Sequence, residues 1–185
     1  LLAILLMPAS ADAARGPATF SAGRSLVAAS SSPGNAYRAG ISIINTAPVA
    51  GDLSVIGGSI VATAPILGDA LLLGGSISSQ ATIGGDARTV GGSITLGGPI
   101  SGDLVALGYS VNDASRTSGS TFIVALNTTV SNGAAGPITV YGNTVSLAGD
   151  FAGNVKVVAI GRLSLAPGTT IHGKLIYEAP EEASI

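Results

Sequence analysis

The chain has 185 residues, close to the length of a single domain, with 10% charged residues, 4% aromatic residues and 27 glycines. This composition is unlike that of an ordinary enzyme or of a charged disordered tail. The eight basic and ten acidic residues are spread thinly, so nucleic acid is not an expected partner, and the absence of cysteine excludes disulfides and thiolate chemistry.

The first segment, residues 1–14, is an apolar run followed by small residues, as in the later part of a secretory signal peptide. Small residues that suit cleavage end at Ala11 and at Ala13. No Met precedes Leu1, so we expect the charged start of the leader to be missing. A buried N-terminal helix is disfavoured, because the run closed by Pro8 is short for one. We therefore expect export, to the periplasm or to the cell surface.

Residues 15–33 contain Pro17 and a Ser-Ser-Ser-Pro-Gly stretch that begins at Ser30. We predict a flexible tail or a partly ordered cap there. A cap has a physical purpose in a β-rich solenoid, because an uncovered terminal strand presents unpaired N–H and C=O groups.

A repeat of 17 residues begins near Gly34 and is the strongest pattern in the chain. Five coils follow without a break, at 34–50, 51–67, 68–84, 85–101 and 102–118. Gly-Asp pairs begin at Gly51, Gly68, Gly85 and Gly102, and Gly-Gly-Ser triplets begin at Gly57, Gly74 and Gly91. Two aliphatic columns keep the same step, namely Ile60, Ile77, Ile94 and Val111, and Val49, Ile66, Ile83 and Ile100.

The repeat predicts strands, because turn-forming residues divide each coil into runs much shorter than the ~10 residues that a helix needs. Apolar residues alternate within the runs, as in Ile41-Ser42-Ile43. We predict an all-β fold, a single-stranded parallel β-helix or solenoid over residues 34–178, with about eight coils of ~17 residues and three short strands per coil. Stacking at ~4.8 Å turns each aliphatic column into an interior ladder.

The register is predicted to loosen after residue 118. The polar segment 112–118 has the composition of a bulged corner, and the later coils are expected to vary in length. Gly142 still lies 34 residues after Gly108, so the same architecture is expected to continue. Drift near the end is typical of a capping region.

A coil of this length with Gly-Asp-Leu, Gly-Gly-Ser-Ile and a proline-preceded aliphatic residue resembles the bactofilins, polymer-forming bacterial cytoskeletal proteins, and their exported relatives. The best matches run from Gly102 to Gly108 and from Ile171 to Tyr177. The resemblance covers about 34–178 and implies a right-handed, roughly triangular β-helix whose molecules join end to end without a nucleotide. It also implies that residues 179–185 are a linker that leads to a missing membrane segment.

The sharpest chemical feature is the column of Asp52, Asp69, Asp86 and Asp103. Carboxylates stacked ~5 Å apart repel by about 0.8 kcal/mol per pair in water, so a cation such as Ca²⁺ is one candidate ligand. The favoured alternative is structural, with glycine supplying a positive φ and aspartate capping a turn. It is favoured because the calcium-binding nonapeptide pattern is absent.

Other candidate side chains are few. His172 is the only histidine and is expected on the surface, without a catalytic partner. Aromatic rings stack on sugars, so the four tyrosines are candidates for a carbohydrate face, but Tyr141 aligns with Leu107 and that alignment indicates packing. The tyrosines are Tyr37, Tyr109, Tyr141 and Tyr177.

Enzymatic activity is not expected, and no catalytic residue or cofactor is predicted. The sequences of hexapeptide acyltransferases repeat every six residues, and the 17-residue repeat of this chain is not a multiple of six. Polysaccharide lyases and hydrolases need a groove with paired carboxylates, bases and aromatic platforms, whereas the basic residues here are single and scattered.

The leading functional prediction is a non-enzymatic scaffold of the bacterial cell envelope that assembles end to end or is anchored to a membrane. Ile41, Ile43, Ile171 and Leu175 are the predicted polymer interface. The expected partners are copies of the chain, with the membrane or the cell wall as further candidates, and neither nucleic acid nor a nucleotide. The alternative is a cell-surface module that binds polysaccharide or cations on one face of the β-helix. A third and more distant hypothesis is that the protein is a degenerate carbohydrate enzyme.

Overall fold

Each coil of the computed structural model, which describes residues 16–183, contains one long strand that bends near its middle. The described residues contain no helix. The strands are β1 (Thr19–Ala28), β2 (Ala36–Asn45), β3 (Leu53–Ala62), β4 (Ala70–Ser79), β5 (Ala87–Leu96), β6 (Leu104–Asp113), β7 (Thr121–Val130), β8 (Ile138–Leu147), β9 (Asp150–Phe151), β10 (Val155–Leu165), β11 (Thr170–Ile171) and β12 (Leu175–Glu178).

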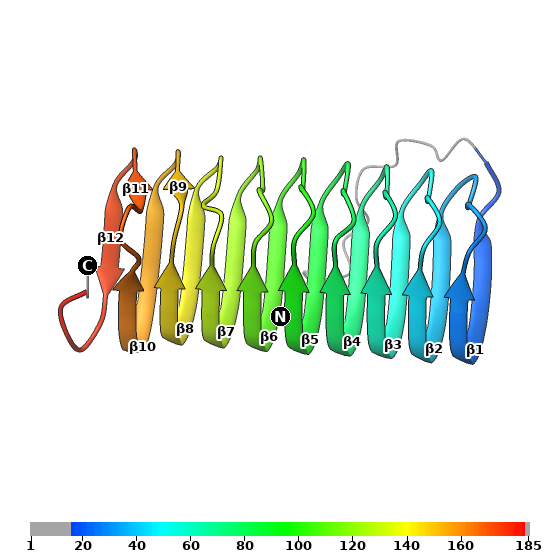
Figure 1. Ribbon diagram of the computed structural model, residues 1–185, viewed down its shortest axis with the longest axis horizontal. Helices are drawn as coiled ribbons and strands as arrows, with labels where there is room; N and C mark the ends of the chain where they lie inside the picture. The colour runs from blue at the N-terminus through cyan, green and yellow to red at the C-terminus, as the bar shows by residue number, and fades with distance from the viewer. Residues whose placement is uncertain (1–15, 184–185) are drawn as a thin grey trace.

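The long strands form one parallel ten-stranded sheet in the order β1-β2-β3-β4-β5-β6-β7-β8-β10-β12, wound into a solenoid of about nine turns (Figure 1). β9 and β11 pair in a small second sheet at one corner. The predicted all-β parallel β-helix is confirmed, with one turn more than the eight expected. At ~4.8 Å per turn, the rod is about 40 Å long.

The 17-residue register holds well beyond the point where the sequence pattern fades. Leu104 pairs with Thr121, Thr121 with Ile138, and Ile138 with Val155, so every step is still 17 residues. The bulged corner predicted at 112–118 is therefore wrong, and the register loosens later than predicted. Coils of different length do occur near the C-terminal end, as predicted. The irregularity lies later, between Ala159 and Arg162 of β10, and the last coil is longer, since Val155 pairs with Leu175 (175 − 155 = 20).

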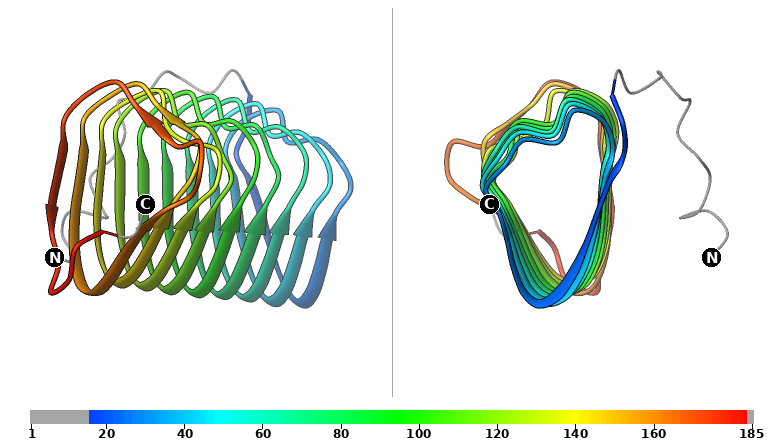
Figure 2. Two further views of the ribbon diagram at one scale, coloured as in Figure 1. Left: turned by 60° about the vertical axis from the view of Figure 1, so that its left-hand side comes forward. Right: turned by 90° about the vertical axis from the view of Figure 1, so that its right-hand side faces the viewer.

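Three short strands were predicted in each coil, but they are not separate, because one long strand bends and continues around a corner. In β4 the inward residues are Ala70 and Leu72 before the bend, and Ile77 and Ser79 after it. The inward set changes from even to odd residue numbers across the Gly-Gly-Ser triplet, so this triplet turns the chain by one corner. The third side is held by a single paired column that contains Ser32, Val49, Ile66, Ile83, Ile100 and Thr117. The cross-section is roughly triangular (Figure 2).

Stacked aliphatic columns fill most of the interior. Both columns predicted from the repeat are buried, from Ile60 to Val111 and from Val49 to Ile100. Each fully buried side chain of this size contributes about 1.5–3 kcal/mol relative to an exposed one. A rod one coil wide has no second layer, so its stability depends on these inward columns and on the ladder of backbone hydrogen bonds between coils.

The ordered chain extends further toward the N-terminus than the repeat indicated. Residues 19–28, expected within the tail or cap at 15–33, form β1, which pairs with β2 at the same 17-residue step. At the other end, Ala179 and Ala183 pack against the core just beyond β12. The expected leader at 1–14 and the last two residues of the expected linker at 179–185 lie outside the described residues.

Candidate functional site

The aspartate column forms a hydrogen-bonded ladder along one corner of the rod. The backbone N–H of Asp69 donates to Oδ1 of Asp52 at 2.9 Å, that of Asp86 to Asp69 at 2.8 Å, and that of Asp103 to Asp86 at 2.9 Å. Asn35 begins the ladder and Ser120 ends it, with the N–H of Ser120 donating to Asp103 at 2.7 Å. One oxygen of every carboxylate therefore holds the next coil in register.

The glycine before each aspartate is needed for space and not for its backbone freedom. The described glycines with positive φ are Gly133, Gly149 and Gly168, none of which belongs to a Gly-Asp pair of the column. A Cβ on Gly68 would collide with Oδ1 of Asp52, and equivalent collisions recur along the ladder. The expectation that these glycines supply a positive φ is thus wrong, because the side chain of the previous coil occupies the room that a Cβ would need.

The remaining carboxylate oxygens are partly neutralised by one arginine. The guanidinium of Arg88 lies 2.8 Å from Oδ2 of Asp86 and 3.8 Å from Oδ2 of Asp69. Within residues 16–183, no group of three or more His, Cys, Asp or Glu side chains is arranged to hold a metal ion. The corner ladder is made of Asn35, Asp52, Asp69, Asp86 and Asp103, and its side chains accept backbone hydrogen bonds from the next coil.

The tyrosines do not form one continuous surface. Tyr37 stacks on Phe20, with ring centroids 4.9 Å apart and an angle of 12° between the rings. Tyr141 lies against Phe122 at 5.9 Å near the other end of the same outward side, and its register with Leu107 through Val124 matches the alignment predicted from the repeat. Tyr109 lies at the strand bend, and Tyr177 is in the terminal strand β12.

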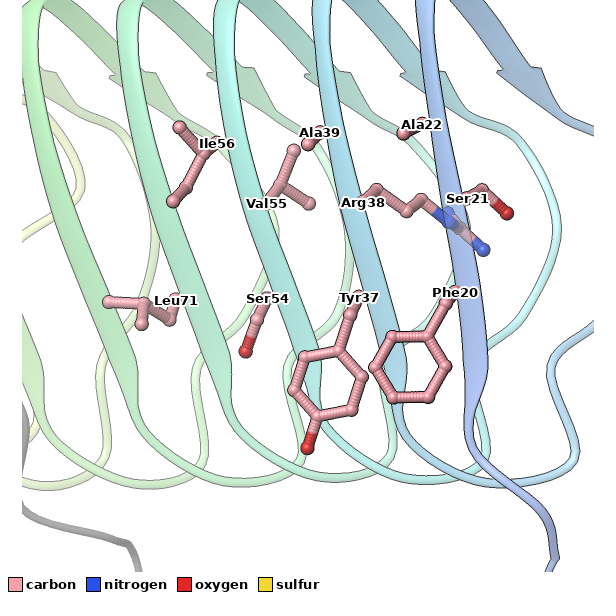
Figure 3. Close-up of a pocket in the computed structure, with 10 residues that line it drawn as sticks. All are labelled: Phe20, Ser21, Ala22, Tyr37, Arg38, Ala39, Ser54, Val55, Ile56 and Leu71. Carbon is pink, nitrogen blue, oxygen red and sulfur yellow. The ribbon is translucent and has the colours of Figure 1, made fainter.

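A groove of about 450 Å³ runs along the outer face of the first four coils (Figure 3). Its walls are mostly apolar and include the stacked Phe20 and Tyr37 together with Ile56 and Leu71. Two columns of outward residues continue this face along the rod, and they are aliphatic or aromatic at most steps.

Two charged residues occupy inward positions that are aliphatic in most other coils. Arg38 occupies the position that Val55 occupies in the next coil. Its guanidinium donates to Oδ1 of Asn45 and, at 3.3 Å, to Oγ of Ser32. Its pKa lies below the usual value because burial disfavours the charged form. The sequence signal that could have revealed this inward position is the 17-residue alignment of Arg38 with the aliphatic Val55 and Leu72.

Asp113 is the second inward charge. It replaces Leu96 of the preceding coil, and its Oδ1 accepts hydrogen bonds from the backbone N–H of Ser115 at 2.9 Å and from the Ser115 hydroxyl at 2.5 Å. Burial raises the pKa of Asp113 to about 6, against the opposing effect of the two hydrogen bonds. The neighbouring hydroxyls of Thr121 and Thr128 are buried without hydrogen-bond partners. Coils six and seven thus contain a polar interior.

Two of the predicted polymer-interface residues lie in the second coil, and the other two lie at the C-terminal end. Ile41 and Ile43 lie in the second coil, one step inside β1, and Ile43 is buried in the core. The N-terminal edge of the sheet is therefore β1, and these two residues do not form it. Ile171 and Leu175 do lie at the C-terminal end, in β11 and β12.

The side chain of His172 contacts one carboxylate near the C-terminal end of the rod. Its Nε2 lies 2.8 Å from Oδ1 of Asp150, and both side chains are at least half exposed. The exposed position agrees with the expectation of a surface residue.

Comparison of the chain with protein-family models, with curated proteins and with solved structures finds no match. Residues 16–183 include no helix that is long and apolar enough to span a lipid bilayer. The geometry of the rod and of its two ends is therefore the basis for a functional proposal.

Proposed function

We propose that this protein is a non-enzymatic structural scaffold of the bacterial cell envelope that self-associates through the ends of its β-helix. We further propose that it is an exported relative of the bactofilins. The coil length, the Gly-Asp and Gly-Gly-Ser corners and the parallel solenoid support this assignment. Export and a membrane anchor after residue 179 belong to the same proposal.

The observation that carries the proposal is the open edge at each end of the sheet. Within residues 16–183, the ten-residue strand β1 pairs on one side only, with β2, and β12 pairs only with β10. A long unpaired strand presents N–H and C=O groups that another chain can continue. Each edge lies at an end of the rod, so strand addition there would lengthen it.

Electron microscopy of the purified chain over a concentration series tests this proposal. We expect thin filaments whose length increases with concentration, with and without Ca²⁺, because the corner ladder uses its carboxylates internally. The N–H of Thr19 bonds to Asn35 in the first coil, so by alternation the N–H of Ala22 faces the open edge. Ala22→Pro should abolish filaments while the fold persists, and Ala22→Thr is the matched control. Monomeric rods at every concentration would overturn the proposal.

A second candidate function is a binding module, and the groove beside Phe20 and Tyr37 favours it. Stacked rings beside an apolar groove suit the face of a sugar ring or an apolar chain. Affinity electrophoresis in gels that contain cell-wall polysaccharide distinguishes this function from the first. Retardation of the chain that is lost in Phe20→Ala, without any filament, would favour the binding module, whereas unretarded migration would exclude it for the polysaccharide used.

A further inference from the structure

The outward side of the first half of each long strand is apolar along most of the rod. Two columns of side chains cover it at the 17-residue step, one from Phe20 to Lys156 and one from Ala22 to Val158. Every member of the second column up to Val158 is apolar, and none of them is buried. The first column has charged residues only at Arg88 and Lys156. These two columns are named the apolar face.

The first outward column beyond the bend is polar by comparison. It has serine in every coil from Ser25 to Ser110, followed by Asn127 and Thr144. Both columns belong to the same strands, so strand propensity alone does not explain the apolar residues on one side of the bend. A large contiguous apolar patch is rare on the surface of a monomer and marks a contact surface.

The apolar face is flat and large enough for a stable interface. The coils nearly superimpose when the rod is viewed along its axis, so the face twists little (Figure 2). About nine coils at ~4.8 Å, each with about four residues at ~3.3 Å, give a face of roughly 560 Å² and about 1,100 Å² for two such faces. A specific protein interface needs about 1,000 Å².

Large and small side chains alternate across the apolar face in the first three coils, where they line the groove (Figure 3). A second copy related by a twofold axis parallel to the rod would place the first column of one molecule against the second column of the other. Each large side chain would then face a small one of the same coil. These pairs are Phe20 with Ala22, Tyr37 with Ala39, and Ile56 with Ser54.

Charge favours this parallel arrangement over an antiparallel one. The corner ladder borders the first column, since Arg88 of that column contacts Asp86 and Asp69. In an antiparallel pair each column would face its own copy, so the two corner ladders and the two Arg88 side chains would come together. In the parallel pair the ladders lie on opposite edges and Arg88 faces the aliphatic Val90. Like charges brought together at an interface are costly.

We infer that two copies of this chain pair side by side, with one apolar face against the other and with their long axes parallel. The contact uses a side of the rod and not its ends, so it goes beyond the proposed end-to-end association and does not depend on it. Sheets that pack face to face lie ~10 Å apart, and the side chains of both apolar faces fill this space.

Sedimentation equilibrium of charged variants tests the contact surface. Val90→Lys places a lysine near the centre of the apolar face, opposite Arg88 of the second copy, and should weaken the dimer at least about a hundredfold. Thr95→Lys is the matched control, because Thr95 is outward and half-buried in the same strand but lies beyond the bend. Circular dichroism verifies that both variants are folded. Equal dissociation constants for the two variants would overturn the inference.

Distances between spin labels test the direction of the pair. The chain contains no cysteine, so single labels can be attached at Ser42→Cys, Ser93→Cys and Thr144→Cys, which share one outward column beyond the bend. A parallel pair gives the same label-to-label distance at all three sites. An antiparallel pair would separate the labels at the two outer sites by about 29 Å along the rod. A longer distance at those sites than at Ser93→Cys would overturn the parallel direction.

Electron microscopy separates this inference from the proposed function. We expect particles two rods wide for the native chain and one rod wide for Val90→Lys. Filaments of single width in the native chain would overturn the inference and leave the proposed function intact, whereas particles two rods wide that never lengthen would do the reverse. A monomeric native chain that binds phosphatidylglycerol vesicles or cell-wall polysaccharide, and loses this binding in Val90→Lys, would assign the apolar face to that partner and overturn the pairing.

Discussion

The coils of β3–β5 and those of β6 and β7 share one backbone register but fill it differently. The earlier coils place Ile60, Ile77 and Ile94 in the interior. The later ones place a carboxylate and hydroxyls there, those of Asp113, Ser115, Thr117, Thr121 and Thr128. Strand pairing continues through both regions without a shift. The backbone hydrogen bonds between coils therefore determine the register, and the side chains in the interior columns determine the stability.

The corners support the same conclusion. The corner ladder ends at Ser120, and Pro137 stands at the next position of that column. Pairing nevertheless continues, since the N–H of Thr121 donates to the carbonyl of Pro137 at 2.8 Å. The aspartates therefore strengthen a register that the backbone can keep without them.

The largest expected effect comes from the aliphatic interior. Ile77→Ala should lower the free energy of unfolding by about 2–5 kcal/mol, because it removes buried methyl groups and leaves a cavity. Urea denaturation measures this loss. Ser78→Ala, on the outward side of the same strand, is the control. A loss below about 0.5 kcal/mol for Ile77→Ala would contradict the assignment of this column to the core.

Asp113 provides the next effect, and it depends on pH. Its pKa is about 6 in the folded chain against 3.8 for a free side chain, so the folded state holds the proton more tightly. The added stability is complete below pH ~4 and is lost as the pH rises through ~6, by up to about 3 kcal/mol. Asp113→Asn should flatten this dependence and raise stability at pH 7. Thermal unfolding at pH 4.5 and pH 7 measures both, and an unchanged profile in the variant would assign the slope to other groups.

The corner ladder should contribute less. Asp86→Ala removes the acceptor of the Asp103 N–H and the partner of Arg88, and we expect a loss of about 1–2 kcal/mol. Asp86→Asn keeps the acceptor, as Asn35 does in the first step of the ladder, and should lose less. Equal losses in the two variants, measured by urea denaturation, would show that the charge and not the hydrogen bond is important.

The smallest effect is a gain in the polar interior. The hydroxyl of Thr128 is buried without a partner, and the equivalent positions in the neighbouring coils are Val111 and Val145. Thr128→Val should raise the free energy of unfolding by about 1 kcal/mol. A loss of stability would indicate that the hydroxyl has a hydrogen-bond partner in solution.

The sequence predicted the solenoid and its inward columns where corner signals recur. The prediction failed in coils whose corner residues differ from this pattern although their backbone follows the same path. β1 has Gly23-Arg24-Ser25 where β3, β4 and β5 have Gly-Gly-Ser, and the first turn was assigned to a tail or cap. After Asp103 the Gly-Asp pairs no longer recur at the 17-residue step, and the continued columns of Val130 and Leu147 were too sparse to show the register. Arg38 and Asp113 lie in coils whose register the repeat gave, but the inward side of each strand changes from one parity to the other at the bend, and the sequence did not show that change.

Deletion of one whole coil tests whether the rod is a stack of equivalent coils held in one register. Removal of residues 70–86 joins Asp69 to Ala87, which keeps the Gly-Asp corner, the inward columns and both ends. Small-angle scattering should show a folded rod about 5 Å shorter, and electron microscopy should show that it still associates. A deletion of residues 70–83, which breaks the register, is the control and should unfold. If the 17-residue deletion unfolds like the control, the rod is not a stack of equivalent coils and the account is wrong.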